Sequence, residues 1–149
     1  MSLEVLLQNS KSLEKQLGWL KHSFDEASKI GLKTKYSLKE YDSFENLCSR
    51  YARTIDFLIR KVFRSLDDVE FETQGTLVDV VNRAHKRGLF ERIEDIRYIK
   101  DLRNEISHEY MDDALQRLFE DILKWTPIVL DMAHNTLNYI DVHVKKSGT

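Results

Sequence analysis

The sequence predicts an all-α protein, an antiparallel up-and-down bundle of four to five helices. Its 149 residues include only five glycines and one proline, so the turns that a β-sandwich or barrel needs every ~8–12 residues are missing. Apolar residues recur instead at steps of three and four along most of the chain, which is the spacing of one helix face. At about 150 residues per domain, this length corresponds to one domain. We therefore expect a single bundle over 1–149, with a flexible tail at 145–149.

The first predicted helix ends at Gly31, and its apolar stripe comprises Leu13, Leu17, Leu20, Phe24 and Ala27. The apolar pattern continues towards the N-terminus through Leu3, Leu6 and Leu7. Trp19 falls close to this stripe, and we expect it to pack in the core. A polar connection follows from Leu32 to Tyr41. Ser43 is the expected N-cap of the next helix, because a serine side chain can accept a hydrogen bond from the first helical turn.

The second predicted helix is long and runs to about Leu66. Its core face comprises Phe44, Leu47, Cys48, Tyr51, Ile55, Leu58, Ile59, Val62 and Leu66. An acidic segment, Asp67 to Gly75, interrupts the pattern. Thr76 can then cap a short third helix that ends at Gly88 and buries Leu77, Val80, Val81 and Ala84.

Two more helices complete the prediction. The fourth has an apolar edge made of Ile93, Ile96, Ile99, Leu102 and Ile106. The spacing of Asp113 and Gln116 is that of a capping box, so the fifth helix is expected to begin there. Its core residues are Leu118, Phe119, Ile122, Trp125, Val129, Ala133, Leu137 and Ile140. Pro127 should deprive the Leu123 carbonyl of its donor and kink this helix.

Charge and cysteine content limit the class of protein. Lys and Arg number 23 against 25 Asp and Glu, a formal charge of −2, which by itself does not indicate a nucleic-acid partner. Cys48 is the only cysteine, so a disulfide scaffold is excluded and a cytoplasmic location is expected. No apolar run approaches the roughly 18 residues of a membrane span, and no signal-peptide pattern is present. We expect no membrane association.

The stretch 102–110 carries the most chemistry, since Arg103, Asn104, His108 and Tyr110 fall within eight residues. At about 100° per residue, Arg103 and His108 cannot meet squarely on one face of a regular helix. Either the helix loosens after Ile106, or these residues complete a site with a second copy of the chain.

This stretch resembles the R-x4-H motif of the HEPN superfamily, with Asn104 as the polar residue that commonly follows the arginine. Tyr110 resembles the tyrosine of the R-x4-H-x-Y form in the HepT-like branch, also described as nucleotidyltransferase substrate-binding proteins. That family is a small all-α bundle of about this length with its motif before the last long helix, so the resemblance covers most of the chain.

The resemblance implies a metal-independent endoribonuclease toxin without a cofactor, active as a homodimer in which two motifs face each other across an RNA substrate. Arg103 would hold the scissile phosphate, His108 would act as general acid and base, and Asn104 would orient one of them. A small nucleotidyltransferase antitoxin would silence the toxin by attaching nucleotide to Tyr110, which adds bulk and negative charge. The alternative is a non-catalytic module of the same fold that only binds this partner, and a lone Arg or His on a helix border is usually a surface residue.

A basic face on the second helix is a second candidate. It carries Arg50, Arg53, Arg60 and Arg64 together with Lys61 and Phe57, and Asp56 is the only acid between positions 50 and 64. Such a face could follow an RNA backbone while the ring stacks on a base. It could equally be a solvated helix face, with Phe57 in a dimer contact.

A metal centre is the third possibility. Glu105 and His108, and likewise Asp131 and His134, have the spacing used in di-iron bundles. Such centres also need inward-facing glutamates on two further helices, and the first two core stripes contain none. We therefore expect no metal site, and we expect Cys48 to be a buried, unreactive thiol.

Overall fold

The computed structural model describes residues 2–72, 75–107 and 112–145. All regular elements within these ranges are helical, and no strand occurs in them, which confirms the predicted all-α class. Six α-helices and two π-helical segments, labelled η, are described: α1 (Ser2–Ile30), α2 (Leu38–Phe57), η1 (Leu58–Val62), α3 (Phe63–Val69), α4 (Leu77–Lys86), α5 (Ile93–Ile106), α6 (Asp112–Tyr139) and η2 (Ile140–Lys145). None of the described helices is both long and apolar enough to cross a membrane.

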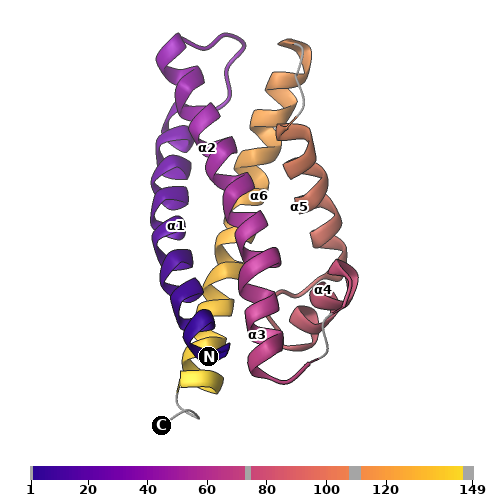
Figure 1. The fold of residues 1–149 in the computed structure, drawn as a ribbon. Coiled ribbons are helices and arrows are strands. Elements are labelled where there is room, and N and C mark those ends of the chain that lie inside the picture. The colour runs from indigo at the N-terminus through magenta and orange to yellow at the C-terminus, as the bar shows by residue number, and fades with distance from the viewer. Residues whose placement is uncertain (1, 73–74, 108–111, 146–149) are drawn as a thin grey trace.

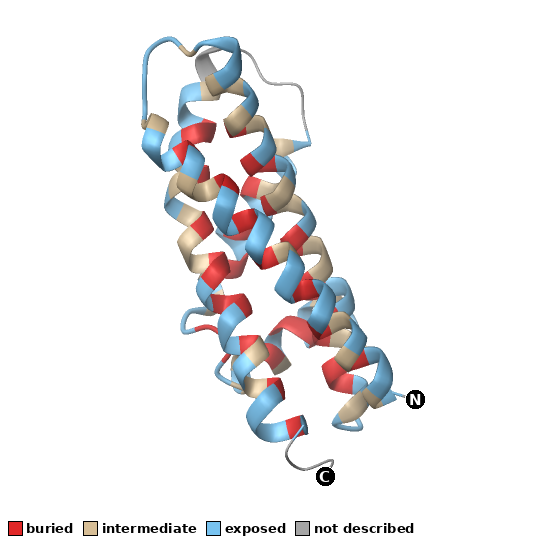
Figure 2. Ribbon diagram, turned by 90° about the vertical axis from the view of Figure 1, so that its left-hand side faces the viewer, coloured by how far each residue is buried: buried red, intermediate tan, exposed pale blue. Residues whose placement is uncertain are grey.

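The long helices α1, α2, α5 and α6 lie side by side (Figure 1). Helix α1 packs against α2, α3 and α6, and α5 packs against α2 and α6. The start of α1 and the end of η2 lie at the same end of the molecule, where α3 and the short α4 are also found (Figure 1). Buried residues follow the helix faces that are turned towards one another (Figure 2). One core therefore runs between the helices.

The predicted limits of α1 and α4 are confirmed, and glycines in the left-handed conformation follow both helices. Gly31 has φ 72° and Gly88 has φ 78°, a conformation that side chains with a Cβ rarely adopt. At the start of α4, Thr76 accepts a hydrogen bond from the N–H of Asp79, and the Asp79 side chain accepts one from the N–H of Thr76. The predicted cap at Thr76 is therefore a reciprocal capping box.

The prediction that Ser43 caps the second helix is wrong. Helix α2 begins directly after Ser37, whose hydroxyl accepts a hydrogen bond from the N–H of Glu40 at 3.2 Å. The Glu40 carboxylate in turn accepts a hydrogen bond from the N–H of Ser37 at 2.9 Å. Ser43 lies inside the helix and donates to the Lys39 carbonyl. The helix starts earlier because Ser37, unlike Ser43, has a glutamate three residues later to complete a capping box.

All nine residues of the predicted core face of the second helix are buried. The structure adds Phe63, which the helical spacing did not place in the core. Over Leu58–Val62 the chain makes a π-helical turn, in which the N–H of Phe63 donates to the carbonyl of Leu58. The wider turn rotates the residues that follow it relative to an unbroken α-helix. Phe63 and Leu66 can therefore both face the interior.

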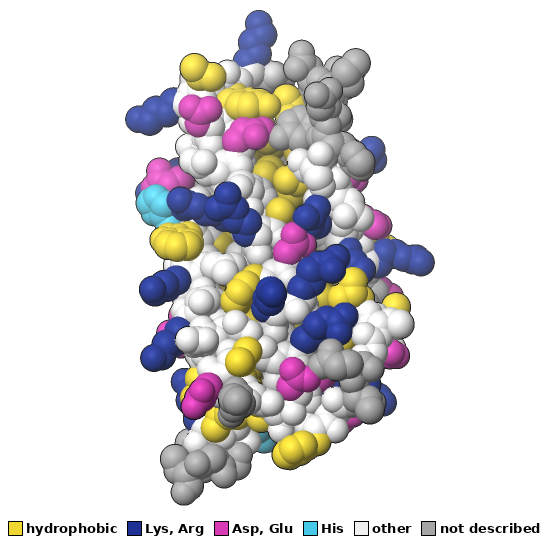
Figure 3. Space-filling view, viewed as in Figure 1, with side chains coloured by type: hydrophobic (Ala, Val, Ile, Leu, Met, Phe, Trp, Pro, Cys, Tyr) yellow, Lys and Arg dark blue, Asp and Glu magenta, His cyan; other side chains and the backbone are white. Residues whose placement is uncertain are grey.

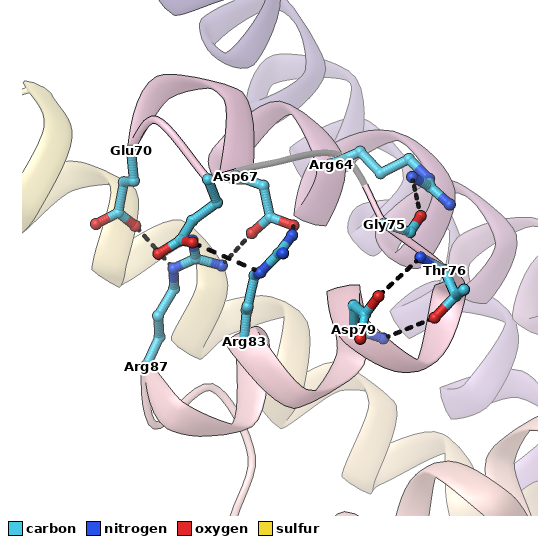
Figure 4. Close-up of polar contacts among 9 residues, drawn as sticks. Arg64, Asp67, Glu70, Gly75, Thr76, Asp79, Arg83 and Arg87 are labelled. Carbon is cyan, nitrogen blue, oxygen red and sulfur yellow. Dashed lines mark hydrogen bonds and ion pairs between the residues drawn. The ribbon is translucent and has the colours of Figure 1, made fainter.

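The acidic segment after Leu66 is not a simple solvated linker. Asp67 is only 1% exposed, and its carboxylate accepts hydrogen bonds from Arg83 at 3.1 Å and from Arg87 at 2.7 Å (Figure 4). Arg87 also donates to Glu70 at 2.7 Å. Burial by itself would lower the pKa of Arg87, but the hydrogen bonds and charges of the two carboxylates outweigh it and raise that pKa. This network fixes α4 against the end of α3.

The last two predicted helices are also present. Helix α5 buries Ile96, Ile99 and Leu102, and the hydroxyl of Tyr51 donates to the Ile99 carbonyl at 3.1 Å. Helix α6 continues through Pro127, so the proline does not end it. The predicted cap at Asp113 depends on side chains outside the described part of the chain.

Candidate functional site

Arg103 lies in the last turn of α5 and is bound to the end of α2. Its Nε donates to Oδ1 of Asp56 at 2.9 Å, and its Nη2 donates to Oδ2 of Asp56 at 2.7 Å. A further bond runs from its Nη1 to the hydroxyl of Ser107, at 2.9 Å. The guanidinium and the carboxylate therefore form a bidentate pair of the kind that fixes the plane of an arginine side chain.

The ion pair keeps Arg103 charged and leaves part of it accessible. The hydrogen bond to Asp56 is the main cause that raises the pKa of Arg103, with partial burial acting against it. The Arg103 and Asp56 side chains are 32% and 37% exposed. An arginine has five N–H donors, of which three are used here. No other described residue accepts from the guanidinium, so within the described part of the chain two donors remain for an anionic ligand while Asp56 stays bound.

Two surface hollows flank this ion pair. The larger, of about 350 Å³, lies between α2 and the end of α5 and includes Arg53 and Ser107 in its lining. The smaller, of about 240 Å³, includes Arg60 and Asn104. Both are lined by Arg103 and Asp56. The structure therefore brings Arg103 and Asn104 together, with a second arginine on either side.

The predicted residues His108 and Tyr110 lie outside the described residues, so their predicted roles stay predictions. Helix α5 ends at Ile106, with Ser107 as its C-cap. The hydroxyl of Ser107 donates to backbone carbonyls of the last turn, including that of Asn104 at 3.1 Å. The regular helix therefore stops between the arginine and the histidine of the motif.

The four arginines predicted to bind RNA have different surroundings. Arg50 donates to the Trp19 carbonyl at 3.0 Å and to the Ser23 hydroxyl at 2.8 Å, so it joins α2 to α1. Arg64 donates to the Gly75 carbonyl at 3.3 Å (Figure 4). Arg53 and Arg60 are exposed. Lys and Arg side chains gather over α2 and its neighbours on the face shown in Figure 3.

Two residues of this surface, Asp56 and Trp19, were not predicted to belong to the site. Asp56 stood out only as the single acid in a basic stretch, and a lone carboxylate among arginines is itself a signal of an ion pair. Trp19 was expected in the core, but it is 56% exposed. At about 100° per residue, Trp19 lies about 80° beyond the edge of the stripe, so the helical spacing places it on the exposed side of α1 and the expectation was wrong.

The remaining candidate groups do not add a reactive centre. Burial raises the pKa of the Cys48 thiol to about 12, so this side chain is a neutral core residue at ordinary pH. Among the described residues, no three His, Cys, Asp or Glu side chains are grouped so that they could hold a metal ion.

Comparisons of the chain with protein-family models, with curated proteins and with solved structures found no match. The class of protein is therefore described by its fold and its site. The chain is an all-α protein with an accessible, carboxylate-anchored arginine on a basic face.

Proposed function

We propose that the chain is a metal-independent endoribonuclease of the HEPN type, the toxin of a toxin–antitoxin pair, which cleaves RNA at a composite site across a homodimer. The observation that carries the proposal is the Arg103 guanidinium at the end of α5, fixed by Asp56 yet left with two donors that no described residue accepts from. Long helices lying side by side suit the antiparallel up-and-down bundle of that family. The motif before the last long helix suits it as well.

The proposed chemistry uses Arg103 and His108 from each protomer. Arg103 binds the scissile phosphate and stabilises the charge that develops on its oxygens. A neutral His108 takes the proton from the RNA 2′-hydroxyl, whose oxygen attacks phosphorus. A protonated imidazole, supplied by the second motif, donates its proton to the departing 5′-oxygen. The products are a 2′,3′-cyclic phosphate and a 5′-hydroxyl, and Asn104 orients one of the reacting groups.

Regulation follows from the position of Tyr110, two residues after His108. A small nucleotidyltransferase antitoxin attaches nucleotide to its phenolic oxygen. The added phosphate lies beside the catalytic pair and repels the phosphate of an incoming RNA.

One observation favours a second candidate function, a non-catalytic module that binds the nucleotidyltransferase. The positive charge of Arg103 is already matched by Asp56 within the same chain. An arginine that is neutralised in this way is suited to a structural role as well as to phosphate binding.

Incubation of the purified full-length protein with single-stranded RNA in EDTA tests the proposal. Cleavage by the wild type is expected, and it should be lost in Arg103→Ala and in His108→Ala. Arg97→Ala is the matched control, because Arg97 is an exposed arginine on the same helix and lines neither hollow. RNA left intact by the wild type, under conditions where the protein is folded and dimeric by sedimentation, would overturn the proposal in favour of the binding module.

A further inference from the structure

A groove between α1 and the α2–η1 junction lies next to the proposed site. Its volume is about 670 Å³, and its lining includes Gln16 and Trp19 from α1 and Arg53, Phe57 and Arg60 from the facing helix. Trp19 is 56% exposed and Phe57 is partly buried. Two aromatic rings from different helices thus border one open groove.

The charges around the groove are strongly asymmetric. Among the described residues, four cationic ones line it, against Asp56 as the only acid. The Asp56 carboxylate is already held by Arg103. Arg53, Arg60 and Lys61 form no ion pair within the described part of the chain. Like charges placed together without a counter-charge favour an anionic ligand.

The groove adjoins the hollows beside Arg103, with which it shares lining residues. Asp56 and Arg53 line both the groove and the larger hollow, while Asp56 and Arg60 line both the groove and the smaller one. A chain molecule bound by Arg103 can therefore extend past these arginines to the aromatic rings of the groove.

We propose that this groove binds a single-stranded segment of RNA next to the scissile phosphate. One base stacks on the exposed Trp19, and the neighbouring phosphates lie beside Arg53, Arg60 and Lys61. Stacking on an aromatic ring combined with backbone contacts to cations is a general mode of binding single strands, and it tolerates different base sequences. The inference rests on the proposed function for the identity of the ligand as RNA.

The test measures binding without cleavage. A fluorescently labelled 12-nucleotide 2′-O-methyl RNA cannot undergo attack by its 2′-oxygen, so its anisotropy in a titration with the full-length protein reports affinity alone. Trp19→Ala should weaken binding by about 5- to 150-fold, the range for loss of one base–aromatic stack. Because Trp19 is largely exposed, this substitution should leave the thermal unfolding midpoint nearly unchanged.

A charge variant tests the phosphate contacts. Arg60→Gln combined with Lys61→Gln should lower the slope of log affinity against log salt by about 1.4 in magnitude, at about 0.7 per contact with a single strand. The control, Arg97→Gln combined with Arg117→Gln, removes the same charge from exposed positions that do not line the groove and should leave the slope unchanged.

A third readout locates the ligand. In a Trp125→Phe background, Trp19 is the only tryptophan left, and the same RNA, unlabelled, should quench its fluorescence on binding. The groove proposal would be overturned if Trp19→Ala bound the RNA as tightly as the wild type and the RNA did not quench Trp19 fluorescence. Dissociation of the dimer by Trp19→Ala with unaltered RNA affinity would also overturn it, because the groove would then be a contact between protomers.

The two proposals can fail separately. If the unreactive RNA binds in the groove but the wild type cleaves no RNA, the groove stands and the ribonuclease fails. If Arg103-dependent cleavage occurs but the Trp19 and Arg60–Lys61 variants bind like the wild type, the ribonuclease stands and the groove fails.

Discussion

The Asp56–Arg103 pair allows a quantitative prediction, which is the free energy of coupling between the two side chains. Charge-assisted hydrogen bonds contribute about 1.5–3 kcal/mol when they are well shielded. Here the two side chains are 32% and 37% exposed, and solvent screening reduces exposed pairs to about 0.2–1 kcal/mol. The bidentate geometry places this pair at the upper end of the exposed range. We therefore expect a coupling of about 1 kcal/mol.

A double-mutant cycle measures this coupling. The free energy of unfolding in urea is determined for the wild type, Asp56→Asn, Arg103→Gln and the double variant, so that losses belonging to one side chain alone cancel. The hydrogen bond from Arg103 to Ser107 is lost in both variants that carry Arg103→Gln, so its loss cancels in the cycle. The exposed pair of Lys21 and Asp25, at 2.8 Å on one helix, is the control, with an expected coupling of about 0.3–0.5 kcal/mol. A coupling for Asp56 and Arg103 no larger than that of the control would refute the reasoning.

The same substitution has a distinct effect on the proposed reaction. Asp56→Asn removes one negative charge beside Arg103, so the KM for RNA should fall. It also frees the guanidinium to leave its fixed orientation, so kcat should fall as well. If Asp56 had a purely structural role, Asp56→Asn would lower the amount of folded enzyme, so the apparent kcat would fall while KM stayed unchanged.

The remaining predictions concern stability. Asp67→Asn should lower the free energy of unfolding in urea by about 3 kcal/mol, at the low end for breaking a buried pair, because both arginines keep a second carboxylate. Burial raises the pKa of Cys48 from 9.0 to about 12 and that of Tyr51 above 10.0. The native state therefore holds these protons more tightly, so the contribution of these two groups to stability should be fully present below pH 9 and decline from pH 9 to 12. Substituting Cys48→Ala and Tyr51→Phe together should flatten that decline in urea titrations at each pH. Gly88→Ala should lower the thermal unfolding midpoint, at a cost of about 1 kcal/mol for its positive φ, whereas Gly18→Ala, within α1, should raise it.

The fold was largely predictable because it depends on local patterns. Three-four periodicity located the long helices, and Thr76 and Gly88 marked the limits of α4. The Ser37 cap was missed because the prediction chose the serine closest to the first core residue. A capping box requires instead a serine with a glutamate three residues later. The burial of Phe63 was missed because a π-helical turn changes the helical phase without leaving a signature in residue types.

The site was less predictable because it depends on contacts between distant segments. Arg103 and Asn104 share one helical turn, so the sequence placed them together correctly. Asp56 meets Arg103 across 47 positions of sequence. This relation is not encoded in the spacing of residues along one helix.

The most direct test of the proposed ribonuclease is the chemical nature of the RNA ends that the wild type produces in EDTA, determined by mass spectrometry. Attack by the 2′-oxygen predicts fragments with a 2′,3′-cyclic phosphate and a 5′-hydroxyl, and no product from a substrate with a 2′-deoxy nucleotide at the cleaved position. A 5′-phosphate end, or cleavage that persists in His108→Ala, would contradict the account.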